Sequence, residues 1–333
     1  MIRTAILGLG GFGKLLAQQL LDHPNATLEA VVDVNTDNLE TAVEEFGVDE
    51  DACYTDETAL YDAHDLDAVI IATPPAFHHR QIFEAFDRGL HVLCEKPVVI
   101  DLEEAREVAA LFEDSSQVLM AGYQRHLDPA FSRGYERWNE GDAEPTFMTG
   151  ELTQDWTHHF ESGTNWRTDP DVGGRGHLFS VGTHVLESLV WMTGLKPESV
   201  SAEMTFYDDA EEIDQESVLS IRFANGTLAS MSDTATAPTE RERIRIWDDD
   251  GALELTSRDW GRPTLTELDA DGAESVCAVD HEDAPGKVEA FLEAIESGTE
   301  PPATVDDVVR VTALLDAAYE SARTGERVTV DLE

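Results

Sequence analysis

Residues 4–13 read TAILGLGGFG, so that a short apolar run passes directly into a glycine-rich turn. The glycines fit the pattern GxGxxG, and helical periodicity begins near Gly11. In a strand–turn–helix unit Gly8 permits the tight turn, Gly10 lets the backbone approach a pyrophosphate, and Gly13 lets helix and strand pack closely. The helix N-terminus adds N–H donors and positive partial charge. The stretch therefore predicts a dinucleotide site, in which Gly8, Gly10, Gly11, Phe12 and Gly13 contact the cofactor.

Short apolar runs alternate with helical patterns up to residue 122. The runs predict buried strands, and the helical patterns begin near residues 11, 37, 56, 76 and 101. Strands separated by single helices imply right-handed crossovers and a doubly wound parallel sheet. We therefore expect an α/β Rossmann domain over residues 1–122, with strands at 4–7, 28–32, 68–72, 91–94 and 118–121.

The pattern changes after residue 122. Helices are expected at 128–139, 177–192 and 305–322, together with alternating strands joined by Asn-Gly and Asp-Gly turns, which favour antiparallel pairing. The length of 333 residues also favours two domains. We expect residues 123–333 to form an α+β domain with a mostly antiparallel open sheet, and the helix at 305–322 could pack back on the first domain. The expected strands are 200–206, 217–223, 226–233, 244–248 and 252–256.

Charge excludes several classes of partner. The chain has 69 acidic and 22 basic residues, giving a net charge of −47, so it should repel nucleic acid and anionic membranes. With 41% hydrophobic residues it still has enough apolar surface for a globular fold. Only four lysines occur, and the acidic residues are spread throughout. This composition is typical of a cytoplasmic enzyme from a halophile, because a carboxylate surface stays hydrated in salt that screens its self-repulsion.

The three cysteines give no sign of a disulfide framework or a metal site. Cys53, Cys94 and Cys277 are widely spaced, without a CxxC pair, and are expected to be small buried residues. No signal peptide and no apolar run of membrane-spanning length is evident. We expect a soluble, cytoplasmic protein without a metal.

Asp33 closes the second predicted strand, twenty positions after Gly13. An acidic residue at this place accepts hydrogen bonds from the adenosine ribose diol and would repel a 2′-phosphate. No arginine adjoins it to bind such a phosphate. The cofactor is therefore expected to be NAD rather than NADP.

Two further loops follow strands of the same sheet. Thr73 and Pro74 come after the strand at 68–72, and Glu95-Lys96-Pro97 comes after the strand at 91–94. Because carboxyl ends of such strands line the cofactor crevice, both loops should contact the dinucleotide. His78 either faces the nicotinamide or is a surface or capping group. Lys96 can donate a hydrogen bond to a substrate oxygen or carry protons, and Glu95 can orient it.

These motifs together resemble the glucose-fructose oxidoreductase and inositol dehydrogenase family (Gfo/Idh/MocA), over essentially the whole chain. The glycine-rich turn, the Thr73-Pro74 loop with His78, Glu95-Lys96-Pro97 and residues 122–125 (GYQR) stand in the family's order. Trp166-Arg167, two glycines and then residues 182–184 (GTH) resemble the segment before the family's catalytic helix.

The resemblance implies a catalytic lysine, aspartate and histidine. Lys96 and His184 match, whereas Ser180 stands in the aspartate's place, four residues before His184 and so expected on the same helix face. Glu187 is the carboxylate nearest to His184 in sequence. The residues expected to contact substrate are Lys96, Arg125, Trp166, Arg167, His177 and His184.

The resemblance also implies the reaction. We expect an NAD-dependent dehydrogenase acting on a CH–OH group of a sugar, sugar derivative or cyclitol, and a homodimer or homotetramer formed through the second domain's sheet. Two alternatives stay open: an NAD-binding regulator without turnover, and an enzyme that uses NAD transiently for elimination or glycoside cleavage. Ser180 in place of the aspartate would permit the first, and tightly bound NAD that is recycled without net consumption would indicate the second.

Overall fold

The computed structural model describes residues 1–162, 166–282 and 284–332. Packing divides the chain into two units, each described here by itself. The segment Pro285–Asp306 groups with unit 1, although the expected domain boundary put it in the second domain. Unit 1 comprises Met1–Val99, Glu103–Gln124 and Pro285–Asp306, and unit 2 comprises Ile100–Leu102, Arg125–Ala284 and Asp307–Glu333.

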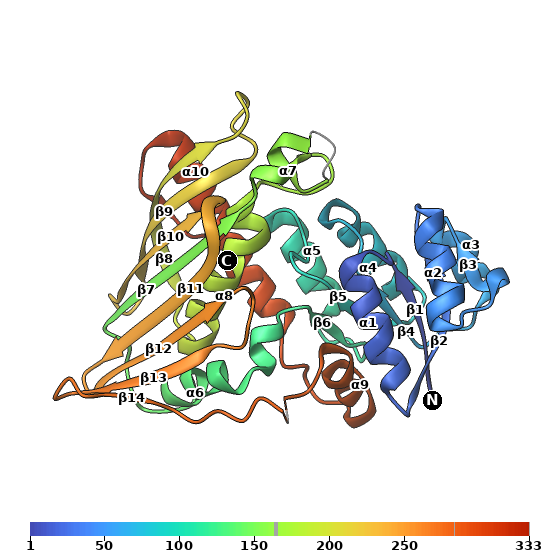
Figure 1. Cartoon of the computed structure of the whole chain (residues 1–333), viewed down its shortest axis with the longest axis horizontal. Coiled ribbons are helices and arrows are strands. Elements are labelled where there is room, and N and C mark those ends of the chain that lie inside the picture. The colour runs from blue at the N-terminus through green and yellow to red at the C-terminus, as the bar shows by residue number, and fades with distance from the viewer. Residues whose placement is uncertain (163–165, 283, 333) are drawn as a thin grey trace. The chain divides into compact units, whose positions relative to one another are not determined.

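Unit 1 contains a six-stranded parallel sheet with the strand order β3-β2-β1-β4-β5-β6 (Figure 1). The chain starts in the middle of the sheet, builds one half, and crosses back to build the other. This confirms the doubly wound Rossmann sheet. The strands are β1 (Ile2–Leu7), β2 (Ala26–Val32), β3 (Cys53–Tyr54), β4 (Ala68–Ile71), β5 (His91–Cys94) and β6 (Leu119–Ala121).

Helices connect these strands. All four residues of β4 are buried, as expected for a parallel strand covered on both faces. The sequence patterns predicted all the helices of this unit except α9, and they missed the two-residue strand β3. The helices are α1 (Gly11–Asp22), α2 (Thr36–Phe46), α3 (Glu57–Ala63), α4 (His78–Asp87), α5 (Leu102–Phe112) and α9 (Lys287–Ser297).

Unit 2 contains a nine-stranded sheet with the order β14-β13-β12-β11-β7-β10-β9-β8-β15. Neighbouring strands are antiparallel except β7 and β10, so the expected mostly antiparallel sheet is confirmed. The strands are β7 (Phe147–Asp155), β8 (Pro197–Phe206), β9 (Asp214–Phe223), β10 (Leu228–Thr234), β11 (Thr236–Asp248), β12 (Gly251–Arg258), β13 (Thr264–Asp269), β14 (Glu274–Val276) and β15 (Val328–Thr329).

Helices cover one face of this sheet. Along β9, Leu219 and Ile221 are buried while Val218 and Arg222 are exposed, so alternate side chains face the helices and the opposite, open face. The buried side chains share one core with the helices. The helices are α6 (Pro129–Trp138), α7 (Thr157–Ser162), α8 (Thr183–Thr193) and α10 (Val305–Thr324).

The helix expected at 177–192 is wrong in its first turn. Residues Leu178–Gly182 form a π-helical turn, in which the Thr183 N–H donates to the Leu178 carbonyl, and α8 starts only at Thr183. Because a π-turn holds more residues than an α-turn, the spacing of three between His177 and Ser180 no longer marks one face, whereas the spacing of four between Ser180 and His184 still falls close to one full turn. The expected common face therefore does not extend to His177.

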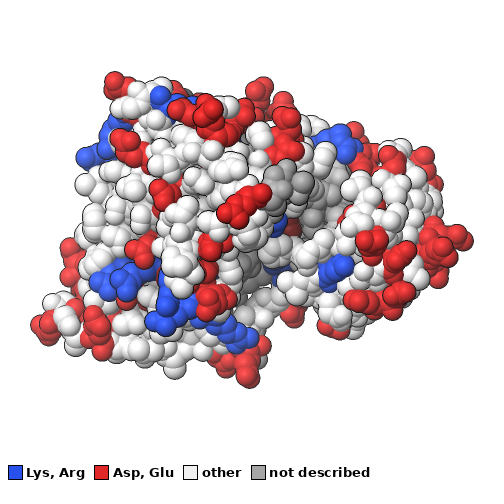
Figure 2. Space-filling view, turned by 45° about the horizontal axis from the view of Figure 1, so that its top comes forward, with Lys and Arg blue, Asp and Glu red and all other residues white. Residues whose placement is uncertain are grey.

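The acidic residues are spread over the surface as expected, whereas the cysteines are not all buried. Figure 2 shows Asp and Glu side chains spread over the face in view, with no single acidic tail. Of the cysteines, Cys94 is buried, but Cys53 and Cys277 are only partly buried, so the expectation of three buried thiols is wrong.

Among the described residues, no helix is both long and apolar enough to cross a membrane.

Candidate active site

The glycine-rich loop lies between β1 and α1, and its glycines have different neighbours. Gly8 has φ +88°, and a Cβ there would lie 2.7 Å from the Ala72 carbonyl oxygen. A Cβ at Gly13 would lie 2.0 Å from the Gly8 carbonyl oxygen, whereas one at Gly10 would meet nothing within 4 Å. Gly8 and Gly13 are thus required for close packing. Gly10 instead borders open space, and no side chain caps α1, so the loop fits a pyrophosphate.

The carboxylate of Asp33 faces this loop. Its Oδ2 accepts the Leu9 N–H at 2.7 Å and the Asn38 side-chain amide at 3.0 Å, and its Oδ1 accepts the Asn35 N–H at 2.8 Å. These three donors are neutral, so the negative charge stays beside the loop. This is the position at which a carboxylate can bind a ribose diol.

His78 joins the two loops that follow β4 and β5. Its imidazole is buried, with Nε2 2.7 Å from the Thr73 carbonyl oxygen and Nδ1 2.9 Å from that of Pro97. Burial lowers the pKa of this histidine, against the opposing effect of the carbonyls and of Glu95. Since both ring nitrogens already have protein partners, His78 holds the two loops together, and the expected contact with the nicotinamide does not follow from its position.

Glu95 has a partner that the sequence analysis did not foresee. Its buried carboxylate bonds to the ammonium of Lys287, at the start of α9. The ammonium also lies 5.7 Å from the ring centroid of Phe12 in the glycine-rich loop. Sequence reasoning missed Lys287, although it is one of only four lysines in the chain. Lys96 follows directly after Glu95 and is partly exposed.

In unit 2, the catalytic candidates lie on the π-helical turn and α8. Ser180 and His184 are both buried, at 7% and 4% exposure, and the His184 ring centroid lies 6.1 Å from that of Trp260. The backbone of the turn is anchored by Asp214, whose Oδ2 accepts the Leu178 N–H at 2.8 Å. Burial and the charge of Asp233 raise the pKa of Asp214 to about 7.

His177, just before the turn, is fully buried, so the expectation that it contacts substrate is not supported by its position. Its Nδ1 lies 2.9 Å from Asp233 Oδ2, and its Nε2 3.2 Å from Gln154 Oε1. The indole N–H of Trp156 donates to that same oxygen at 2.9 Å, which identifies it as an acceptor. Nε2 must therefore carry a hydrogen.

Glu187 and Arg125 are also paired within unit 2. The Glu187 carboxylate bonds to Nε2 of His126. The buried Arg125 guanidinium bonds to Glu242 and to Ser188 Oγ, the latter at 3.2 Å. The pairing with Glu242 gives Arg125 a structural partner, and the expected substrate contact of this arginine stays a prediction.

Trp166 and Arg167 form a short 3-10 turn, Trp166–Thr168. The guanidinium lies 4.2 Å from the indole centroid, and burial lowers the pKa of Arg167. A Cβ at Gly173 would lie 1.9 Å from the Trp166 carbonyl oxygen, so this glycine is required for the turn to pack here. Both side chains are partly exposed and remain candidates for substrate contact.

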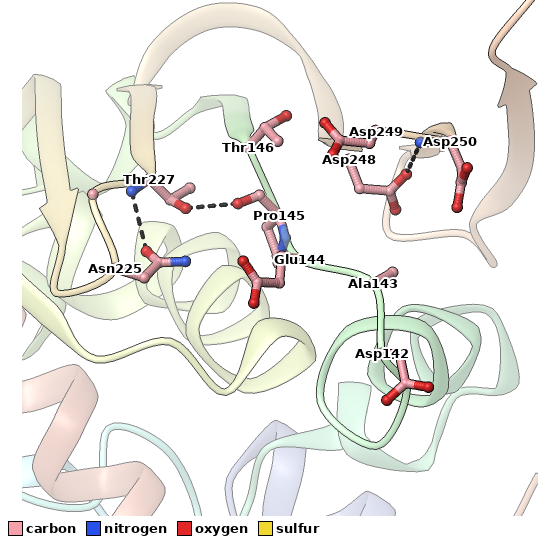
Figure 3. A pocket seen from close by; sticks show the side chains of 11 residues that line it. Asp142, Ala143, Glu144, Pro145, Thr146, Asn225, Thr227, Asp248, Asp249 and Asp250 are labelled. Atoms are coloured by element: carbon pink, nitrogen blue, oxygen red, sulfur yellow. Dashed lines mark hydrogen bonds between the residues drawn. The ribbon is translucent and has the colours of Figure 1, made fainter.

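A hollow in unit 2 with a volume of about 570 Å³ lies away from all of these residues (Figure 3). Its lining is acidic, with Asp142, Glu144 and residues 248–250. Thr227 Oγ1 donates to the Pro145 carbonyl at 2.6 Å and helps to hold its wall. Within the described ranges, this hollow included, no three His, Cys, Asp or Glu side chains are placed so that they could hold a metal ion together. The hollow contains none of the predicted site residues.

Comparison with known proteins adds to this picture. A family model described as "Oxidoreductase family, NAD-binding Rossmann fold" matches residues 2–123, and one described as "GFO/IDH/MocA C-terminal domain" matches residues 143–254. The chain is 29% identical to D-xylose 1-dehydrogenase (NADP(+)) 2 of Haloferax volcanii, over 98% of this chain and 99% of that protein. It is 27% identical to inositol 2-dehydrogenase of Rhizobium meliloti, over 99% of each chain.

Solved structures share the fold. Levoglucosan dehydrogenase in complex with NADH has a TM-score of 0.86 at 22% identity, over 99% of both chains. Aldose-aldose oxidoreductase from Caulobacter crescentus has a TM-score of 0.85 at 22% identity, over 98% of this chain and 99% of that one. The chain therefore belongs to the Gfo/Idh/MocA family of NAD(P)-binding oxidoreductases.

Proposed function

We propose that this protein is an NAD-dependent dehydrogenase that acts on a hydroxyl or carbonyl group of a sugar, sugar derivative or cyclitol. The observation that carries the proposal is the glycine-rich loop, where open space at Gly10 and the carboxylate of Asp33 lie beside an uncapped helix N-terminus. Relatives named as xylose and inositol dehydrogenases support the substrate class.

The chain's own residues have distinct roles in this reaction. Bound NAD supplies the hydride acceptor. The coenzyme is held by the loops at Thr73-Pro74 and Glu95-Lys96 and by Gly8, Gly10, Gly11, Phe12, Gly13 and Asp33. His184 takes the proton of the substrate hydroxyl, and Lys96 stabilises the negative charge that develops on the oxygen. Ser180 can accept or donate a hydrogen bond near His184 but contributes no charge.

The test is a screen for NAD reduction, followed at 340 nm over a panel of aldoses and cyclitols in molar KCl. We expect at least one aldose or cyclitol to reduce NAD. The proposal would be contradicted if the protein binds NAD tightly but no compound of the panel leads to NAD reduction.

The preference for NAD rests on Asp33, and relatives named as NADP-dependent make it worth a separate test. Replacing Asp33 with Ser and Asn35 with Arg should remove the repulsion of a 2′-phosphate and supply a cation for it. We expect wild-type kcat/KM to favour NAD and the double variant to narrow or reverse that ratio. A wild-type preference for NADP would show that Asp33 does not select the coenzyme.

Ser180 favours a second candidate function. A regulator without turnover needs no base, so Ser180 in place of a charged residue is compatible with that role, and an enzyme that recycles NAD during elimination or glycoside cleavage is the other alternative to net dehydrogenation. A relative named 2,7-anhydro-N-acetylneuraminate hydratase, 27% identical over 59% of this chain, points in the same direction. Tightly bound NAD with no net consumption would support this second candidate.

The open face of the nine-stranded sheet fits self-association. Phe147, Val218 and Leu228 on it are 42%, 59% and 41% exposed. Further along the same sheet, Arg241, Arg243, Arg258 and Arg262, together with Glu151 and Glu242, line a hollow of about 660 Å³ in a chain that is strongly acidic. We propose a homodimer or homotetramer formed through this face. Light scattering should show an oligomer that Val218→Glu dissociates, and a wild-type monomer at micromolar concentration would contradict it.

A further inference from the structure

Lys287 lies in unit 1 with its ammonium removed from water, since its side chain is only 7% exposed. A lysine is rarely buried unless a carboxylate neutralises it. Its partner is Glu95 Oε1, on a side chain that is 9% exposed, and the ammonium also lies 3.5 Å from the Gly122 carbonyl oxygen. The two side chains thus form a buried ion pair that joins α9 to the end of β5.

The ion pair is close to two parts of the proposed site, the residue Lys96 and the glycine-rich loop. Glu95 directly precedes Lys96, so the carboxylate that Lys287 neutralises is the one adjacent to the catalytic candidate. The Lys287 ammonium also lies 5.7 Å from the ring centroid of Phe12, which is half exposed in the glycine-rich loop. An ammonium at this distance from a ring attracts it.

Gly122 shows that the position of Glu95 is specified by its surroundings. A Cβ at Gly122 would lie 2.9 Å from Glu95 Oε2 and 2.9 Å from the Glu95 Cα. Any larger residue would push the carboxylate away from Lys287. The first glycine of the GYQR motif therefore makes room for this ion pair.

We propose that Lys287 is a positioning residue, which neutralises the carboxylate beside Lys96 and supports Phe12 of the coenzyme loop. The role at Lys96 rests on the proposed dehydrogenase function, whereas the role at Phe12 needs only coenzyme binding. Without Lys287, the buried carboxylate one residue before Lys96 would lose its ammonium partner, and an uncompensated negative charge this close in the chain favours the protonated lysine. Other titratable groups that respond to Glu95 are His78 on α4 and Cys94 on β5.

The test compares Lys287→Met, Lys287→Arg and the charge-balanced pair Lys287→Met with Glu95→Gln, and Lys196→Met at an exposed lysine serves as control. NAD affinity is measured by calorimetry in molar KCl, without any substrate. We expect Lys287→Met and the charge-balanced variant to lose about fivefold in NAD affinity, because the support of Phe12 is gone. Lys287→Arg should keep the affinity, and so should the control.

The pH dependence of kcat with an established substrate tests the role at Lys96. Lys287→Met should move the basic limb upward by about one unit, and the charge-balanced variant should return it to the wild-type position. If Lys287→Met does not fold, the charge-balanced variant still tests the coenzyme contact. Wild-type NAD affinity in that variant would overturn the role at Phe12, and an unmoved basic limb in folded Lys287→Met would overturn the role at Lys96. A wild type that binds NAD but turns over no substrate leaves the affinity result valid and counts against the proposed function alone.

Discussion

The glycine-rich loop of unit 1 and the turn at 176–182 of unit 2 both lead into a helix, but different forces hold them. In the loop, backbone meets backbone: Gly8 lies against Ala72, and Gly13 against Gly8. The turn is held by hydrogen bonds from buried polar side chains. The Asp214 carboxylate accepts the Leu178 N–H, and the Asp233 carboxylate bonds to the imidazole of His177. The loop should therefore be sensitive to an added methyl group, and the turn to pH and charge.

The largest effect should come from the two side chains proposed to act in catalysis, Lys96 of unit 1 and His184 of unit 2. We expect His184→Ala and Lys96→Ala each to lower kcat by ~10² to 10⁴, the usual contribution of general acid–base catalysis, with NAD affinity kept. The exposed residues His158 and Lys196 provide matched alanine controls. Turnover by His184→Ala at the wild-type rate would mean that another group is the base.

Two glycine substitutions separate packing from ligand contact in the loop. Gly13→Ala places a methyl group 2.0 Å from the Gly8 carbonyl oxygen, so both Tm and NAD affinity should fall. Gly10→Ala meets nothing within 4 Å, so it should keep the Tm and lose NAD affinity by about tenfold or more through the contact with the pyrophosphate. Equal NAD affinity in Gly10→Ala and wild type would place the coenzyme elsewhere.

The Asp214 carboxylate, which anchors the π-helical turn, predicts that the stability of the fold depends on pH. The pKa of Asp214 is about 7 in the folded chain and 3.8 ordinarily, so between these values the folded state holds a proton that the unfolded chain has released. Stability from this group is therefore greatest, and constant, below about pH 4, falls as pH rises towards 7, and is constant again above. Urea unfolding of wild type and Asp214→Asn should show their difference in unfolding free energy shrinking by a few kcal/mol from pH 5 to 8. Parallel curves, as expected for the exposed control Asp249→Asn, would contradict this.

The smallest effect per residue on stability is expected from the exposed carboxylates, because only their combined charge changes the Tm noticeably. Their mutual repulsion in a chain of net charge −47 is screened by salt, so Tm should rise steeply with KCl concentration. Scanning calorimetry between dilute buffer and molar KCl measures it. An unchanged Tm would refute the inference of salt dependence from composition.

Local sequence patterns were enough to predict the parallel sheet, the glycine loop and most strands of unit 2. Each of these depends on residues close together in the chain. The pairs that shape the candidate site could not be found this way: His177 with Asp233 is 56 positions apart, and Lys287 with Glu95 is 192. The π-turn escaped prediction for the same reason, because the Asp214 carboxylate that anchors it lies on β9.

The most direct test of the proposed reaction follows a deuterium atom. A substrate found in the screen is deuterated at the carbon that bears the reacting hydroxyl group, and one turnover with NAD is analysed by mass spectrometry. Net dehydrogenation predicts one deuterium on the reduced nicotinamide and none at that carbon of the product. Deuterium kept in or returned to the product, with no reduced coenzyme accumulating, would contradict the account and indicate transient use of NAD.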